Sequence, residues 1–300
     1  MHLLKKYGIT FCLILCAVWS PQSEARAQSV TGDTSSTQHD SHKPIYHVNF
    51  WVSVPIIAVG GAGGIYFISH SKSNITPTEL AAVNPNNVPS FDRWSLHQDI
   101  SLVPTWDVYS KDGQIAGVVM PLLILLDGDV RPDWLDVMTI GLEVNMVTLG
   151  IYSISPLGPS FQTRYRPLVY YPYASAHAAG INQSDGNNKS SFYSGHVASL
   201  TASAFFLAKV YCDYHTDANK YLVYGAAAVP SLAMGYIRLM TLDHFPSDIA
   251  VGLAVGVACG VLIPELHRIG DKNLSMGVYS SPTGGTGLTL QWTPPVMASK

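Results

Sequence analysis

Long apolar runs separated by short polar stretches organise most of the chain. Runs with few or no charges cover residues 50–69, 115–126, 135–157, 194–210, 221–237 and 249–263. Apolar runs of this length are typical of helices rather than strands, and the longest of them could cross a membrane. The pattern therefore predicts an all-α, membrane-associated helical bundle whose core covers residues 114–268.

The first apolar run leaves two interpretations open. Its centre reads Gly60-Gly61-Ala62-Gly63-Gly64, and glycines let neighbouring membrane helices approach closely. The same glycines are compatible with a broken or re-entrant segment. Residues 70–113 mix polar and apolar positions and contain several prolines, which predicts short interfacial helices. We assign no chemistry to this part of the chain.

Both ends of the chain differ from the helical core. Two lysines precede a short apolar stretch and an Ala-Arg-Ala cleavage site, so residues 1–27 are expected to be a signal peptide rather than an uncleaved membrane helix. The polar residues 28–49 predict a flexible linker. Residues 269–300 hold two stretches of alternating apolar and polar positions around a Pro-Thr-Gly-Gly turn, which is typical of a short β-hairpin-like tail.

Composition favours a membrane protein and excludes one class of partner. The 300 residues are 47% hydrophobic and 12% charged, whereas roughly 25% of residues are charged in soluble domains. The formal net charge of -3 leaves no basic surface for nucleic acid. Cys212 and Cys259 lie in apolar helical stretches, where free buried thiols are expected instead of a disulfide framework.

Three short segments carry residues suited to phosphate chemistry. They read Arg164-Tyr165-Arg166-Pro167, Tyr193-Ser194-Gly195-His196 and Arg238-x5-His244-x3-Asp248. A planar guanidinium grips two oxygens of a phosphate at once, which suits Arg166 and Arg238 to a phosphate-binding cradle. Gly195 permits the backbone to approach the phosphate closely.

The two histidines suit phosphoryl transfer. A neutral and correctly oriented imidazole can attack phosphorus, and a carboxylate four residues along a helix can hold it in place. His244 and Asp248 have this spacing. A second histidine that gives up a proton near neutral pH can protonate the leaving oxygen, and His196 is the candidate.

Together the three segments resemble, in order and spacing, the motifs of the type 2 phosphatidic acid phosphatase superfamily. That pattern runs Lys-x6-Arg-Pro, then Pro-Ser-Gly-His, then Ser-Arg-x5-His-x3-Asp, and the resemblance covers residues 115–263. It implies that His244 forms a phosphohistidine, that Asp248 orients it and that His196 protonates the leaving group. It also implies that no metal or cofactor takes part, and that four residues hold the phosphate: Arg166, Ser194, Gly195 and Arg238.

The chain departs from the family pattern at three positions. Pro159 stands where the family has lysine, Tyr193 where it has proline and Ile237 where it has serine. The missing lysine removes one cation from the expected cradle. We expect Arg164 to replace it in binding phosphate, because Arg164 and Arg166 would point the same way in an extended stretch before a proline.

The placement of the motifs predicts that they converge. The first follows the run 135–157, residues 194–196 open the next run, and one crossing down and one crossing back return residues 238–248 to the same membrane face. The connection 168–191 would cover the site as a specificity loop, and a disordered surface loop is the alternative. Glu143 is interpreted as a structural polar contact inside the bundle rather than as a group of the site.

The expected function is hydrolysis of a phosphate monoester or pyrophosphate on a lipid headgroup, with a phospholipid or polyprenyl phosphate as substrate. The expected place is a bacterial inner membrane, with the site facing the periplasm. That orientation requires one apolar run, 50–69 or 115–126, not to span. Three alternatives stay open: a soluble periplasmic acid phosphatase of the same fold, a vanadate-dependent haloperoxidase, and a catalytically impaired member that binds phospholipid.

Overall fold

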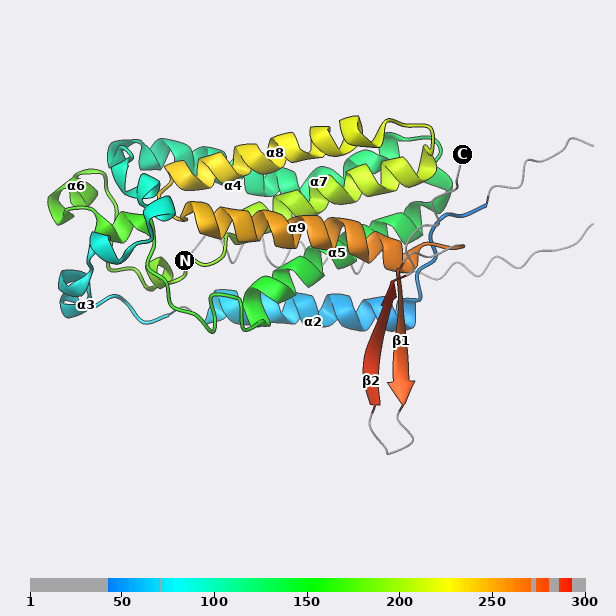
Figure 1. Ribbon diagram of the computed structural model, residues 1–300, viewed down its shortest axis with the longest axis horizontal. Coiled ribbons are helices and arrows are strands. Elements are labelled where there is room, and N and C mark those ends of the chain that lie inside the picture. Colours follow the sequence, from blue (N-terminus) through cyan, green and yellow to red (C-terminus); the bar gives the residue numbers. More distant parts are fainter. Residues whose placement is uncertain (1–42, 71, 271–273, 281–285, 293–300) are drawn as a thin grey trace, which may run out of the picture. The chain divides into compact units, whose positions relative to one another are not determined.

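The computed structural model describes residues 43–70, 72–270, 274–280 and 286–292. The expected signal peptide and most of the expected linker lie outside these residues. Figure 1 shows the long helices lying side by side. They are α2 (Phe50–Ser69), α4 (Val103–Val119), α5 (Trp134–Ile154), α7 (Gly195–Tyr214), α8 (Lys220–Met240) and α9 (Pro246–His267).

Short helices connect the long ones and gather mainly at one end of the bundle (Figure 1). They are α3 (Pro77–Ala82), α6 (Tyr173–Ala178), and the 3-10 helices η1 (Pro85–Asn87), η2 (Ser90–His97), η3 (Ile100–Leu102), η4 (Met120–Leu126), η5 (Arg131–Asp133), η6 (Pro167–Tyr170) and η7 (Gly186–Lys189). Short helices at residues 70–102 agree with the expectation for residues 70–113, whereas residues 103–113 form the first part of the long helix α4.

Helix α7 forms the centre of the bundle. It packs against α4, α5, α8 and α9, and α2 packs along α5. The main hydrophobic core joins buried side chains of three helices, among them Val137, Ile140 and Val144 of α5, Ala202, Phe206 and Val210 of α7, and Cys259 and Ile263 of α9. The fold is therefore the helical bundle that the apolar runs predict.

The contact between α7 and α9 is unusually close. Gly252, Gly256 and Gly260 recur every four residues along α9, and a Cβ atom on Gly256 would lie 2.6 Å from the carbonyl oxygen of Ala198. Because only glycine leaves room for this approach, the spacing brings the starts of the two helices together. The amide of Ser194 donates to the carbonyl oxygen of Asp248 at 3.2 Å.

The structure corrects the expectation for one apolar run and decides between the two alternatives for another. Residues 115–126 are not one helix but the end of α4 followed by η4, and Pro121 near the junction has no amide hydrogen to continue an α-helix. Residue 114 therefore lies inside α4 rather than at the start of a separate core. Residues 50–69, in contrast, form one continuous helix, α2, which is neither broken nor re-entrant.

Two strands follow the helices. β1 (Leu274–Ser280) pairs antiparallel with β2 (Thr286–Trp292), so that Leu274 lies opposite Trp292 and Ser280 opposite Thr286. These strands coincide with the alternating stretches of the sequence. The turn expected between them lies outside the described residues.

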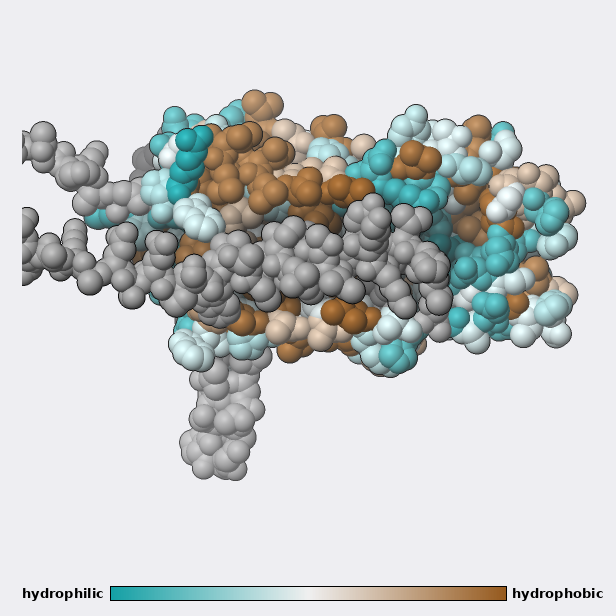
Figure 2. Space-filling view, turned by 180° about the vertical axis from the view of Figure 1, so that it is seen from behind, coloured by the Kyte–Doolittle hydropathy of each residue, from teal (hydrophilic) through white to brown (hydrophobic). Residues whose placement is uncertain are grey.

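Among the residues that the structure describes, four helices, namely α2, α5, α8 and α9, are long and apolar enough to cross a membrane. Large apolar side chains are exposed along α8: Tyr221, Leu222, Val229, Leu232 and Tyr236. Figure 2 shows hydrophobic surface along the helices and hydrophilic side chains toward the end that carries α3 and α6. Glu143 is buried and contacts His267 at 3.2 Å, as expected for a polar contact inside the bundle.

The packing of α2 on α5 leads to a stability prediction. A Cβ atom on Gly60 would lie 2.1 Å from the carbonyl oxygen of Met146, whereas one on Gly61 would meet only the Met146 sulfur at 3.5 Å. Gly60→Ala should therefore lower the free energy of unfolding by about 1–3 kcal/mol through overpacking. Gly61→Ala is the control and should be neutral or slightly stabilising. Thermal unfolding of the detergent-purified variants measures both; equal melting temperatures would contradict this packing.

Candidate active site

The three motifs meet at the end of the bundle where α7 and α9 begin and α8 ends (Figure 1). The first motif reaches this place by pairing with residues 188–191. The Arg164 amide donates to the Lys189 carbonyl at 3.0 Å, and the Arg166 amide donates to the Asn188 carbonyl at 2.9 Å. The connection 168–191 is thus a structured segment with η6, α6 and η7, not a disordered loop.

Asp243 joins the two arginines that were expected to hold phosphate. Arg238, in the last turn of α8, contacts one carboxylate oxygen of Asp243 at 2.8 Å, and Arg166 bonds the other oxygen. Arg238 is only 3% exposed and also donates to the Ser110 hydroxyl of α4 at 2.7 Å. The two guanidinium groups are therefore held beside each other, as a phosphate cradle requires.

The backbone turn that carries Asp243 is strained. Leu242 has a φ of 56°, in the left-handed region that non-glycine residues rarely adopt, and it is fully buried. Such a conformation costs on the order of 1–3 kcal/mol and persists where surrounding packing imposes it. Burial alone would raise the pKa of Asp243, but Arg166 and Arg238 outweigh it and hold that pKa below its usual range.

His244 has a defined orientation. Its Nδ1 atom lies 2.6 Å from the carbonyl oxygen of Ser191, and its Nε2 atom lies 3.4 Å from a guanidinium nitrogen of Arg238. Because a carbonyl only accepts, Nδ1 carries the proton and Nε2 carries the lone pair. Burial and the nearby Arg238 and Arg166 hold the pKa of His244 well below its usual range, so the ring is neutral.

Asp248 does not bond His244 directly in this structure. Its carboxylate lies 3.9 Å from Nδ1 and accepts hydrogen bonds from the Ser191 hydroxyl at 2.6 Å and from the Phe245 amide at 2.8 Å. Other donors bond its oxygens in this structure, and the expected orientation of His244 by Asp248 itself stays a prediction. Asp248 supports Ser191, whose carbonyl holds the ring.

Arg164 pairs with two carboxylates. One of its terminal nitrogens contacts Asp92 at 2.6 Å, and the other bonds Asp248 and the Ser247 hydroxyl. Both carboxylates are almost completely buried. In this structure Arg164 belongs to an ion-pair network that ties η2 to the start of α9, and its expected role in phosphate binding stays a prediction.

Several hydrogen-bond donors of the cradle have no partner. The Ser194 hydroxyl and the Nε atoms of Arg166 and Arg238 are buried and unpaired. Buried polar groups are normally paired, so a cluster of open donors indicates a site for an anion with several acceptor oxygens. His196 lies close enough to these arginines and to Asp243 to feel their charges, which puts both histidines beside the cradle.

Tyr152 of α5 completes the wall of the site. A Cβ atom on Gly195 would lie 3.0 Å from its ring, so the motif glycine is required for this contact. Tyr152 is also within electrostatic reach of Arg166, Arg238 and Asp243. Position 195 therefore serves packing against an aromatic ring as well as access to the phosphate.

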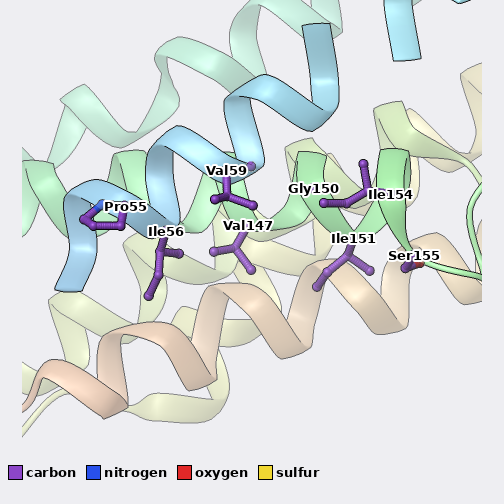
Figure 3. Close-up of a pocket in the computed structure, with 9 residues that line it drawn as sticks. Pro55, Ile56, Val59, Val147, Gly150, Ile151, Ile154 and Ser155 are labelled. Atoms are coloured by element: carbon purple, nitrogen blue, oxygen red, sulfur yellow. The ribbon is translucent and has the colours of Figure 1, made fainter. Parts of the chain in front are cut away.

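Two cavities lie near the site. Figure 3 shows an apolar groove of about 460 Å³ between α2 and α5, lined by residues that include Ile56, Val147 and Ile154. A second cavity of about 190 Å³ is lined by polar and apolar residues, among them Ile154, Pro159 and Ser190. Ile154 borders both cavities, so they are neighbours, and Ser190 precedes the residue that holds His244.

Residues 138–269 match the family model of the PAP2 superfamily. This segment belongs to the PAP2 superfamily. A search of the curated proteins found no match, and a search of the solved structures found none either. The PAP2 segment contains all three motifs, and its family implies phosphatase activity on phosphoesters. It leaves out α2 and η2, which supply the groove and Asp92.

Three residues of the PAP2 site were missed from sequence. Asp92 lies in a region to which no chemistry was assigned, and Ser191 acts through its backbone carbonyl, which no motif encodes. Of the three, only Asp243 could have been found from the sequence, because it directly precedes the candidate nucleophile His244. Its partners, however, follow from the left-handed turn at Leu242.

One group of side chains in the described part of the chain has a geometry that could hold a metal ion. Asp127, Asp129 and His215 place their ligand atoms within 4.8 Å of one another. They lie at the C-terminal end of α7, away from the PAP2 motifs at its start. His215 already contacts Asp127 at 2.7 Å, which accounts for the cluster as an ion pair.

The Arg164 network predicts a stability effect. Arg164→Ala would leave Asp92 and Asp248 buried without their cation, which should cost on the order of 3 kcal/mol of unfolding free energy. Adding Asp92→Asn should restore part of the loss. Lys111→Ala is the control, since it removes a cation from an exposed pair of little energetic weight. Thermal unfolding of the purified variants tests this, and a melting temperature of Arg164→Ala equal to wild type would refute it.

Proposed function

We propose that the protein hydrolyses a phosphate monoester or pyrophosphate of a lipid, through a phosphohistidine and without a metal ion. The observation that carries this proposal is the orientation of His244. The Ser191 carbonyl accepts a hydrogen bond from Nδ1–H of this ring, so the lone pair on Nε2 is directed toward the arginine cradle. A neutral imidazole next to open phosphate donors is a nucleophile placed at an anion site.

The proposed reaction has two steps. Nε2 of His244 attacks phosphorus and the bond from phosphorus to the leaving oxygen breaks. His196, which would take up a proton when the phosphate anion binds beside it, gives that proton to the leaving oxygen. Water then attacks phosphorus, His196 takes a proton from the water, and the bond between phosphorus and Nε2 breaks, which releases inorganic phosphate and restores neutral His244. Arg166, Arg238 and the Ser194 hydroxyl would stabilise the charge that develops on the phosphoryl oxygens, because their open donors are already in position.

The apolar surroundings support a lipid as substrate. The groove between α2 and α5 ends at Ile154, next to the cavity that borders Pro159 and Ser190. A hydrocarbon chain in the groove would leave its phosphate end near the motifs. Lys72 and His70 also line the cavity at Pro159, so a headgroup there would meet a lysine side chain although position 159 itself is proline.

Orientation in the membrane depends on the leader. Tyr46 pairs with Arg268 at the C-terminal end of α9, whereas the site lies at the N-terminal end of that helix. A bundle that crosses the membrane along α9 therefore holds residues 43–49 and the site on opposite sides. The proposed periplasmic site requires that the residues before α2 stay on the cytoplasmic side. Export of residue 28 would place the site in the cytoplasm.

Substitution of the histidines tests the mechanism. His244→Ala should abolish turnover, and His196→Ala should slow it by about 10²- to 10⁴-fold, because general acid catalysis contributes that much. The loss in His196→Ala should be smaller for a nitrophenyl ester than for an alkyl ester, since nitrophenolate leaves without a proton. His47→Ala, an exposed histidine at the far end, is the control. Unchanged turnover in His244→Ala would remove the phosphohistidine from the proposal.

Inhibitors test the source of charge neutralisation. EDTA should leave hydrolysis unchanged, because arginines provide the positive charge. Vanadate should inhibit, because it adopts five-coordinate geometry and resembles the transition state. Steady-state rates of the purified protein with each compound give the answer. Loss of activity with EDTA and its recovery with a divalent ion would replace this proposal by a metal-dependent reaction.

A further inference from the structure

A carboxylate lies between the two arginines that would bind the phosphoryl group. Arg166 and Arg238 each contact one oxygen of Asp243, and this residue is only 8% exposed. The family pattern leaves the position before the nucleophilic histidine open, so Asp243 belongs to this chain rather than to the motif. A substrate must bring its phosphoryl oxygens to the same guanidinium groups that Asp243 already contacts.

The charged and titratable groups that face Asp243 come from several elements. They are the guanidinium groups of Arg166 and Arg238, the imidazoles of His244 and His196, the phenol of Tyr152 and, as a polar neighbour, the Thr241 hydroxyl. Two other sources of positive charge are missing from the cradle. Pro159 replaces the family's lysine, and Arg164 is paired with Asp92 and Asp248.

These charges leave a small positive surplus. Two guanidinium cations face one carboxylate, so the cradle holds a single uncompensated positive charge while both histidines are neutral. Charges in a buried site are poorly screened by water and salt. A phosphoryl group with one negative charge matches this surplus, whereas a dianion brings one charge too many and is repelled by Asp243.

We propose that Asp243 determines specificity by making the cradle select a phosphoryl group that carries one negative charge over a dianion. This inference rests on the proposed function, since it concerns the group that the same cradle would bind. Phosphate monoesters lose their second proton near pH 6. The protein would accordingly bind monoesters best below about that pH, whereas a phosphodiester anion, which has one charge throughout, would bind equally well at higher pH.

The nucleophile suits the same range. Burial and the neighbouring arginines hold the pKa of His244 well below its usual range, so its imidazole stays neutral where a monoester is a monoanion. Turnover alone cannot isolate Asp243, because turnover also depends on proton transfer by His196. Binding of compounds that do not react separates the two effects.

The first experiment uses the wild-type chain purified in detergent. Binding of an α,α-difluoroalkylphosphonate, whose second proton is lost in the same pH range as that of a phosphate monoester, and of its monomethyl ester is measured by calorimetry at pH 5 and pH 8. The ester carries one charge at both pH values and meets the same histidines, so its affinity should be unchanged. The parent phosphonate should bind at least about tenfold more weakly at pH 8, where it is a dianion. Equal or tighter binding of the parent at pH 8 would overturn the inference.

The second experiment removes the carboxylate charge. Asp243→Asn should recover about tenfold in affinity for the parent phosphonate at pH 8 and change the affinity for the ester little. Asp217→Asn, an exposed residue between α7 and α8, makes the same change in charge away from the site and is the control. If Asp243→Asn weakens binding of both compounds at both pH values, Asp243 only clamps the arginines and the inference is wrong.

The two proposals fail in different ways. Binding of both compounds with no dependence on charge would overturn the role of Asp243 while hydrolysis through His244 could still be observed. If neither compound binds and no phosphoester is hydrolysed at any pH, the proposed function fails and the inference about Asp243 fails with it. The wild-type measurements distinguish these outcomes even if Asp243→Asn does not fold.

Discussion

The backbone contact between α7 and α9 determines where the rest of the site lies. Glycines every four residues along α9 let the backbones of α7 and α9 approach so closely that no side chain fits between them at these positions. The first turns of the two helices therefore lie side by side. Ser194 and Asp248 share a backbone hydrogen bond at that point. The nucleophile precedes α9 by two residues and the proton donor opens α7, so this single packing constraint sets the separation of the two histidines. Larger residues at the glycine positions of α9 would push the two helices apart and so change the distance between His244 and His196.

Charge is distributed around the site in two opposite arrangements. On one side, the carboxylate of Asp243 lies between two arginines and leaves positive charge in excess. On the other side, Arg164 lies between Asp92 and Asp248 and leaves negative charge in excess. The arginines around Asp243 keep unpaired donors that an anion can use. The terminal nitrogens of Arg164 already have partners, and these contacts hold the loops together. A buried ion pair is weak evidence for stability, yet removing one partner is costly, so the second arrangement is a scaffold for the first.

Sequence predicted the helical bundle, the convergence of the motifs and the PAP2 relationship, because these depend on apolar runs and on spacing along the chain. It did not predict which groups the motif side chains contact. Arg164 had the right charge and position to replace a lysine, but Asp92, seventy-two residues earlier, bonds it. Asp248 had the right spacing to orient His244, but the Ser191 carbonyl does so. Such assignments are decided by competition among partners distant in sequence, and periodicity carries no information about that competition.

The segment before α2 has a consequence for how the chain can mature. Tyr46 is fully buried, and its hydroxyl donates to Asp213 at 2.6 Å within a cluster of buried charges that includes Lys209 and Glu265. A protease that cut after residue 46 would take this phenol away and open the cluster to lipid or water. Cleavage after residue 27 would leave it in place. The last residues of the expected linker thus cover the end of the bundle opposite the site. Proteolytic processing that keeps this contact has to cut before Tyr46.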